Sequence, residues 1–249
     1  MRLTRLFCAA PLASATDIEL SDTAAEHLTR VLRARVGDAL ILFDGHGGEY
    51  AASVLQITKR AVRVTVAARQ NIEREAKVAI TLLQSLARGE KMDWIVQKAT
   101  ELGVAHIVPV ASARSVVQLD AQQAERKAAH WRDVVISACE QCGRNRLPAV
   151  DVPGELAQAC AALVASPQTP RWVLDSAGTQ SLSAAVRSTL APANHASAVI
   201  LIGPEGGFAE HELALAAHYG FVAVTMGSRV LRTETAGLAA LAAIAALVE

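Results

Sequence analysis

The stretch that most constrains the fold is residues 198–212, where an apolar run leads into a glycine-rich loop and then a helical pattern. Residues 198–202 are continuously apolar, which is typical of a strand buried on both faces. The loop 203–207 reads GPEGG, and its glycines and proline suit a tight backbone path. The helical pattern over 209–218 carries two glutamates in its first turn. This order predicts a loop whose backbone N–H groups face a ligand closely.

The loop differs from the better-known glycine-rich loops. Gly203 is followed by Pro-Glu, which does not fit G-x-G-x-x-G, and no Lys-Ser or Lys-Thr follows, as a P-loop requires. Taken alone, the loop fits an ordinary strand-to-helix turn as well as it fits a ligand site. The next segment favours the ligand site, because a second apolar strand at 221–227 leads into the polar stretch 228–236. Two such loops at strand ends form a pocket at the edge of a parallel sheet.

The composition is that of a globular protein. The chain has 249 residues, 52% hydrophobic and 19% charged, which suffices for one large domain or two small ones. The formal net charge is zero, so a nucleic-acid-binding surface would have to be local. The N-terminus lacks the apolar core of a signal peptide, and no apolar stretch is long enough for a membrane span. We therefore expect a soluble cytoplasmic protein with no membrane partner.

The candidate metal ligands form no recognisable site. Cys139 and Cys142 fit C-x-x-C, but they fall inside a helical pattern and have no second pair to complete a zinc site. His211-Glu212 begins like H-E-x-x-H, but position 215 is leucine. The sequence also lacks G-x-S-x-G. It therefore predicts a chemistry that needs no metal and is not that of a serine hydrolase.

The chain divides into two predicted domains. Short strands and one helix, capped by Ser21 and expected to run to Gly37, fill residues 1–71 and predict a small β-barrel. The charged, non-periodic stretch 70–77 is the expected linker. Over 72–249, strands and helices alternate, which favours a mostly parallel α/β sheet. The expected elements there are strands at 78–84, 104–110, 171–175, 198–202 and 221–227, and helices at 91–103, 120–142, 155–165, 209–218 and 236–248.

Several motifs together resemble a known family, the RsmE-type 16S ribosomal RNA uridine-N3 methyltransferases of the SPOUT class. The matching segments of the second domain are residues 90–103, 113–115, Glu140-Gln141 with Arg144, 201–207 and 227–236, and those of the first are 5–7 and 27–33. GPEGG followed by LRTETA at this separation is the specific part, and the match covers nearly the whole chain. The resemblance implies a PUA-like RNA-binding barrel at 1–71 and a methyltransferase domain with a deep trefoil knot at 72–249.

The resemblance also implies partners and a cofactor. A bent S-adenosyl-L-methionine would lie in the knot, the protein would be a homodimer, and the target would be uridine 1498 in 16S rRNA of the small ribosomal subunit. The apolar helix expected at 236–248 agrees with a dimer, although burial inside its own domain explains it equally well. Two other functions remain open: a knotted RNA-binding protein without catalysis, and a nicotinamide-dependent oxidoreductase, which the missing G-x-G-x-x-G disfavours.

The expected site residues fall into three groups. Cofactor contacts are expected from Leu174, Leu201, Ile202, Gly203, Pro204, Glu205, Gly206, Gly207, Met226, Gly227, Ser228, Val230 and Leu231. Methyl transfer to N3 requires loss of the imide proton, which a carboxylate or an arginine can assist, and the candidates are Glu205, Arg232, Glu234 and Arg144. The alternative for Arg232 and Glu234 is a salt bridge that frames the last helix. RNA contacts are expected from Arg5, Arg30, Arg33, Lys59 and Arg60, for which solvated charge on the barrel is the alternative.

Overall fold

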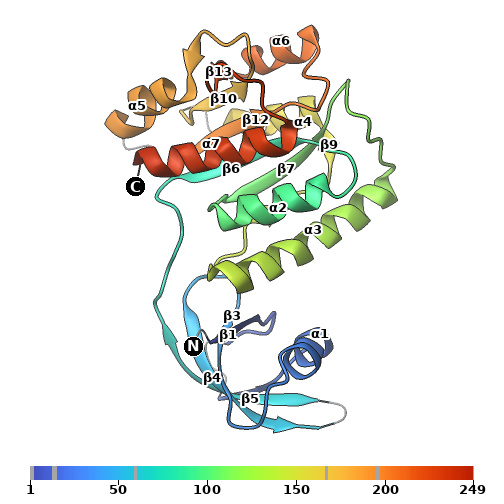
Figure 1. Cartoon of the computed structure of the whole chain (residues 1–249), viewed down its shortest axis with the longest axis vertical. Helices are drawn as coiled ribbons and strands as arrows, with labels where there is room; N and C mark the ends of the chain where they lie inside the picture. The colour runs from blue at the N-terminus through green and yellow to red at the C-terminus, as the bar shows by residue number, and fades with distance from the viewer. Residues whose placement is uncertain (1–2, 13–15, 59–60, 166–167, 194–196, 249) are drawn as a thin grey trace. The chain divides into compact units, whose positions relative to one another are not determined.

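The computed structural model describes residues 3–12, 16–58, 61–165, 168–193 and 197–248, and they form two compact units (Figure 1). The N-terminal unit consists of residues 1–75 together with 136–147, and the C-terminal unit of 76–135 together with 148–249. The long helix α3 (Ala121–Cys142) therefore contributes its last two turns to the N-terminal unit.

The N-terminal unit is built on a five-stranded sheet. Its strand order is β1 (Thr4–Phe7), β3 (Ala39–Phe43), β4 (Glu49–Ile57), β5 (Val62–Gln70) and β2 (Asp17–Glu19). Only the β1–β3 pair is parallel, and the other pairs are antiparallel. Alternate residues of β5 face the core, so Val62, Val64 and Val66 are buried while the residues between them are exposed.

The helix of this unit is shorter than the sequence indicates. Helix α1 (Asp22–Glu26) begins at Ser21, whose side chain accepts the N–H of Ala24 at 3.4 Å, and the predicted N-cap is thereby confirmed. The helix continues as a π-helical turn, η1 (His27–Val31), and does not reach Gly37 as expected. The chain leaves the helix at Arg33, whose φ of 53° lies in the left-handed region that ends helices.

The C-terminal unit is an eight-stranded sheet in which every strand pairing is parallel. The order is β11-β13-β10-β12-β6-β7-β8, and β9 also pairs with β7. The strands span Ala79–Ser85 (β6), His106–Ala111 (β7), Ala149–Val150 (β8), Gly154–Glu155 (β9), Arg171–Leu174 (β10), Gln180–Ser181 (β11), Ser197–Ile202 (β12) and Val222–Thr225 (β13). The expectation of a mostly parallel α/β sheet is confirmed, with the apolar strand β12 at its centre.

Helices cover this sheet on both faces (Figure 1). They are α2 (Lys91–Glu101), α3, α4 (Leu156–Ala162, followed by a 3₁₀ turn at Leu163–Ala165), α5 (Leu182–Ala193), α6 (Glu210–His218) and α7 (Thr233–Val248). Helix α7 packs on β6 and β12 beside α2 and α5, whereas α4 and α6 pack on a separate apolar cluster around Leu201. No helix of the described residues is both long and apolar enough to cross a membrane.

Close packing of α7 on the sheet depends on a glycine. A Cβ at Gly237 would lie 3.2 Å from the side-chain oxygen of Gln84 and 3.3 Å from a methyl group of Leu82. A larger residue would push the helix away from the sheet. This approach brings the start of α7 beside the end of β12, where the candidate site lies.

Candidate active site

A pocket of about 520 Å³ lies at the carboxyl ends of β10, β12 and β13 in the C-terminal unit. Its walls are the loops that follow these three strands and the first turn of α7. The cofactor residues expected from the sequence that line it are Leu174, Ile202, Gly203, Pro204, Glu205, Gly207, Met226, Gly227, Val230 and Leu231. This is the edge where parallel α/β sheets bind ligands, and the volume is in the range of small-molecule sites.

Three of the expected cofactor residues do not line this pocket. Leu201 is fully buried in the apolar cluster on the face of the sheet that α4 and α6 cover. The carbonyl oxygen of Gly206 accepts a hydrogen bond from Arg114 at 3.1 Å, and Ser228 is exposed in the loop before α7. Side chains alternate along a strand, so neighbouring strand residues cannot both face the same side.

The GPEGG loop makes a tight turn. The N–H of Gly207 donates to the carbonyl oxygen of Pro204 at 2.9 Å, which closes the turn. Gly207 has a φ of 66° and Gly227, in the opposite loop, has a φ of 81°. Both lie in the left-handed region, where a Cβ is strained, so glycine is required by conformation at each position.

A buried hydrogen-bond chain joins the two loops of the pocket. The hydroxyl of Thr233 donates to the carbonyl oxygen of Gly203 at 2.7 Å and accepts from the amide nitrogen of Gln84 at 3.0 Å. Both side chains are buried, and the same Gln84 nitrogen also donates to the carbonyl oxygen of Ser85 at 3.1 Å. Thr233 therefore holds the start of α7 at a fixed distance from the GPEGG loop. Neither residue was expected at the site from the sequence.

Glu212 is a second residue with a role that was not expected from the sequence. One of its oxygens accepts the N–H of Ala209 at the start of α6, and the other accepts the N–H of Ala113 in the loop after β7, each at 2.8 Å. The residue is only 5% exposed. A buried carboxylate that accepts two backbone N–H groups fastens these two loops together at the positive end of the helix.

Lys91, from the first turn of α2, lies between two carboxylates at the pocket. Its Nζ is 3.4 Å from an oxygen of Glu205 and 3.3 Å from an oxygen of Glu234. Burial alone would raise the pKa of Glu205, but backbone N–H groups and Lys91 outweigh it and hold that pKa below its usual value. Glu205 is therefore ionised at neutral pH, which makes it a hydrogen-bond acceptor and a weak base.

Arg232 remains available for a substrate. Its Nη1 is 4.0 Å from an oxygen of Glu234, at the limit of an ion pair, and its side chain is 81% exposed. Arg232, Glu205 and Lys91 thus line one pocket, and Glu234 lies outside the lining but pairs with both Lys91 and Arg232. The salt bridge considered as an alternative is present but leaves most of the guanidinium in solvent.

Comparisons with known proteins agree with this architecture. The family model described as an RNA methyltransferase domain matches residues 74–245, and the one described as an RNA methyltransferase PUA domain matches residues 20–67. The ribosomal RNA small subunit methyltransferase E of Bacillus subtilis is 34% identical over 225 residues, which cover 88% of this chain and 85% of that protein. This chain belongs to the ribosomal RNA small subunit methyltransferase E family.

Two solved structures extend the likeness to the full length. A ribosomal RNA small subunit methyltransferase E from Neisseria gonorrhoeae, bound to S-adenosyl methionine, is 34% identical with a TM-score of 0.87, covering 99% of this chain and 98% of that one. A Legionella pneumophila protein, in complex with the bound cofactor SAM, is 34% identical with a TM-score of 0.90 and the same coverage. Membership of the methyltransferase E family confirms the expected enzyme class, the α/β fold and the PUA-like N-terminal domain.

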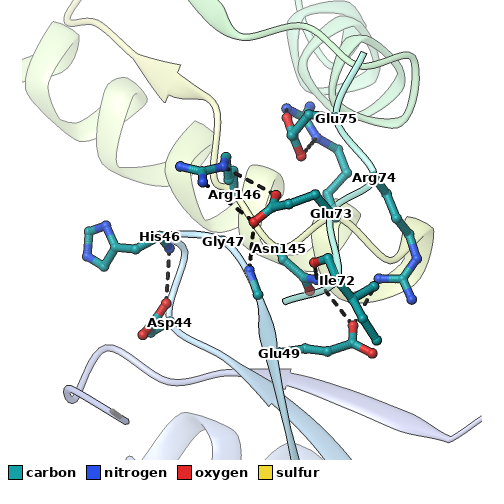
Figure 2. Close-up of polar contacts among 12 residues, drawn as sticks. Asp44, His46, Gly47, Glu49, Ile72, Glu73, Arg74, Glu75, Asn145 and Arg146 are labelled. Carbon is teal, nitrogen blue, oxygen red and sulfur yellow. Dashed lines mark hydrogen bonds and ion pairs between the residues drawn. The ribbon is translucent and has the colours of Figure 1, made fainter. Parts of the chain in front are cut away.

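The four catalytic candidates of this methyltransferase E chain do not all belong to the same unit. Arg144 belongs to the N-terminal unit, where it is 4% exposed and forms two hydrogen bonds with the carboxylate of Glu75. The adjacent Asn145 donates to the carbonyl oxygen of Ile72 at 2.6 Å (Figure 2). The structure therefore gives Arg144 the environment of a structural ion pair.

Arg5 is likewise committed to internal contacts. Its side chain is 7% exposed, donates to Glu49 at 2.7 Å and to Asn145, and lies 5.3 Å from the ring centroid of Phe43. A buried guanidinium with these partners is poorly placed to bind an RNA phosphate.

The other residues expected to bind RNA are differently placed. Arg30 is 78% exposed but forms an ion pair with Glu26 at 2.5 Å, one helical turn away. Arg33 is exposed. Lys59 and Arg60 lie outside the described residues.

Cys139 of the C-x-x-C motif is a protonated thiol. Cys139 is fully buried, and its contact with Cys142 together with burial raises its pKa far above the usual range. Across the described ranges, no group of three or more histidine, cysteine, aspartate or glutamate side chains has the arrangement of a metal site.

Proposed function

We propose that this enzyme transfers a methyl group from S-adenosyl-L-methionine to N3 of uridine 1498 in 16S rRNA of the small ribosomal subunit. The observation that carries the proposal is the pocket at the carboxyl ends of β10, β12 and β13, in a chain whose family relatives are ribosomal RNA methyltransferases. The nucleotide and its N3 atom come from the resemblance of the sequence motifs. The substrate and the family relationship together favour action in the cytoplasm.

The pocket suits S-adenosyl-L-methionine. Its volume of about 520 Å³ is bounded by apolar side chains, including Leu174, Ile202 and Leu231, and by the backbone of two glycine-bearing loops. An adenine ring needs apolar walls and backbone hydrogen bonds, whereas nucleotide cofactors are held through their phosphates by loops such as G-x-G-x-x-G, a pattern that the GPEGG loop does not follow. When bound, this cofactor supplies a methyl group on a positively charged sulfur. Loss of the N3 proton makes that nitrogen nucleophilic, and correct positioning is then the main requirement for transfer.

We assign the side chains of the pocket as follows. Arg232, which is 81% exposed, donates to a carbonyl oxygen of the uridine, where negative charge gathers once N3 loses its proton. Glu205 and Glu234 accept hydrogen bonds from polar groups in the pocket, and Lys91 keeps their two charges from repelling each other. The lowered pKa of Glu205 argues against a role as a strong base, so loss of the N3 proton depends mainly on stabilisation of the anion.

We also propose that the enzyme is a homodimer whose C-terminal unit is knotted. The support for the dimer is helix α7, which has alanine, leucine, isoleucine and valine on nearly every side. Only part of its surface is buried within the chain, at positions that include Ala236, Gly237, Ala240, Leu241 and Ile244. An apolar helix that is half-covered favours a partner on its remaining side. Sedimentation at micromolar concentration tests this, and a monomer with full methyl transfer would refute it.

A methylation assay tests the proposed reaction. Small ribosomal subunits and protein-free 16S rRNA from a strain lacking the enzyme are incubated with isotopically labelled S-adenosyl-L-methionine. Label should enter 16S rRNA, and mass mapping should locate one methyl group on uridine 1498. A methyl at N3 blocks base pairing, so reverse transcription should stop beside that nucleotide. Label at another nucleotide, or none, would contradict the proposal.

Variants separate cofactor binding from transfer. Arg232→Ala should keep the affinity for S-adenosyl-L-methionine, measured by calorimetry, and lose about 100-fold in kcat, because the arginine acts on the anion. Arg187→Ala, which removes an exposed arginine of α5 outside the pocket lining, is the matched control and should keep both values. An equal decrease in kcat in the two variants would contradict the role assigned to Arg232.

A further inference from the structure

Three exposed arginines lie in loops at the edge of the sheet where the pocket opens. Arg88 lies in the loop between β6 and α2, Arg114 in the loop after β7, and Arg229 in the loop between β13 and α7. All three follow the carboxyl ends of strands, which meet at one edge because the sheet is parallel. We call these three residues the arginine rim.

Each rim residue is tied to the pocket by a direct observation. The backbone N–H of Arg88 points to an oxygen of Glu205 at 3.5 Å, the outer limit of a hydrogen bond. The Nη1 of Arg114 donates to the carbonyl oxygen of Gly206 at 3.1 Å, and Arg229 lines the pocket itself. The backbone of Arg88 and the guanidinium of Arg114 therefore lie beside the GPEGG loop, and the opposite loop carries Arg229.

The rim arginines lack acidic partners within the described part of the chain. None of their guanidinium groups forms an ion pair with a described carboxylate, and the glutamates of the pocket mouth are occupied by Lys91. Arg114 uses only one of its five N–H donors on Gly206. The positive charge of the rim is thus uncompensated.

The N-terminal unit shows the opposite pattern. Six of its arginines form ion pairs with carboxylates, namely Arg5, Arg30, Arg63, Arg74, Arg144 and Arg146. A chain with no net charge therefore neutralises many arginines inside one unit and leaves those beside the pocket free. Free guanidinium groups at a pocket mouth are suited to an anionic partner.

We propose that the arginine rim binds phosphates of the RNA strand on either side of the target nucleotide, and so seats that nucleotide over the pocket. The inference rests on the proposed function and adds the residues that hold the substrate. A guanidinium presents a planar pair of N–H groups that matches two phosphate oxygens, and an RNA strand supplies phosphates at regular intervals. Arg114 also contacts the backbone of the GPEGG loop, so a phosphate bound there would be placed against the cofactor site.

The salt dependence of RNA binding tests the rim. Each phosphate contact contributes about 0.7–0.9 to the slope of log affinity against log salt, so Arg88→Ala/Arg114→Ala should lower the slope by about 1.4–1.8. Between about 50 and 200 mM salt, the wild type should then lose about tenfold more affinity for 16S rRNA than the double variant. Affinity for S-adenosyl-L-methionine should be unchanged, because neither side chain lines the pocket.

Two further variants make the result specific. Arg126→Ala/Arg187→Ala removes exposed arginines of α3 and α5 and should leave the slope unchanged. Arg88→Lys/Arg114→Lys keeps the charge and should restore the slope, with a smaller loss of affinity from the missing bidentate geometry. An unchanged slope in the rim alanine variant, an equal change in the α3/α5 variant, or no restoration by lysine would each overturn the inference.

The test distinguishes this inference from the proposed function. A wild-type enzyme that binds 16S rRNA with a rim-dependent slope but transfers no methyl group would contradict the function and support the rim. A wild type that methylates uridine 1498 while the rim variant keeps its slope would support the function and overturn the rim.

Discussion

Replacing Glu49 with glutamine should destabilise the N-terminal unit at neutral pH by about 3 kcal/mol, and the loss should disappear in acid. The Glu49 side chain is 6% exposed and accepts hydrogen bonds from Arg5 at 2.7 Å, Arg74 at 2.9 Å and Asn145 at 3.2 Å. Burial alone would raise its pKa, but these hydrogen bonds outweigh burial and lower the pKa from 4.5 to about 2.

The size and sign of the effect follow from this lowering. A decrease of about 2.5 in pKa corresponds to about 3 kcal/mol at about 1.36 kcal/mol for each pKa unit. The folded pKa lies below the unfolded one, so the stability is fully present above about pH 4.5 and is lost as the pH falls toward about 2. Glutamine has nearly the same shape as glutamate but no charge. The Glu49→Gln variant therefore lacks the pH-dependent contribution of this side chain to the free energy of unfolding.

The assay is urea unfolding from pH 7 to pH 3, with hydrogen exchange of β4 and β5 peptides reporting on the N-terminal unit. All three tryptophans, Trp94, Trp131 and Trp172, lie in the C-terminal unit, so their fluorescence follows that unit separately. Glu26→Gln is the matched control, because its carboxylate is 59% exposed and its ion pair among the described residues is the exposed one with Arg30. If the difference in free energy of unfolding between wild type and Glu49→Gln stayed constant below pH 4.5, the reasoning would be refuted.

Three more substitutions probe the candidate site. Thr233→Val removes the hydrogen bond to Gly203 and should weaken S-adenosyl-L-methionine binding about tenfold by calorimetry, whereas Thr233→Ser keeps the hydroxyl and should keep the affinity. Equal affinity in the two variants would contradict the role of this hydrogen bond. Gly207→Val forces a Cβ into a φ of 66° and should lower stability by about 1–2 kcal/mol in urea, together with weaker cofactor binding; unchanged values would show that the loop relaxes freely. Glu212→Gln replaces one of the two acceptor oxygens with a donor, so it should lower the free energy of unfolding by about 2 kcal/mol and speed hydrogen exchange at the start of α6. Unchanged protection there would contradict the role assigned to Glu212.

Strands and pocket loops were predictable from the sequence because their signals are local. A short apolar run such as 198–202 has no stable place except a buried strand, and glycines directly after it mark a tight strand-end loop. Helix α5 (Leu182–Ala193) was missed because its alanines and serines form only a weak apolar stripe.

Side-chain roles were less predictable, because they depend on partners far away in the sequence. Arg144 was assigned to catalysis from its motif, yet it pairs with Glu75, and Arg5 was assigned to RNA, yet it pairs with Glu49. No local pattern distinguishes a buried arginine with a distant carboxylate from a solvent-facing one. Polar residues inside apolar strands, such as Gln84, were the one signal that could have pointed to the Thr233 bridge.

The return of residues 136–147 to the N-terminal unit has a consequence for inheritance and engineering. The polypeptide passes between the two units three times, near residues 75, 135 and 147. A gene fragment that ends at Glu75 would encode the sheet without Asn145 and Arg144, leaving the carboxylates of Glu49 and Glu75 without those donors. Neither unit is a continuous stretch of the sequence, so exchange between homologous genes must transfer both segments of a unit together. A graft of the PUA-like unit onto another enzyme must likewise include the end of α3.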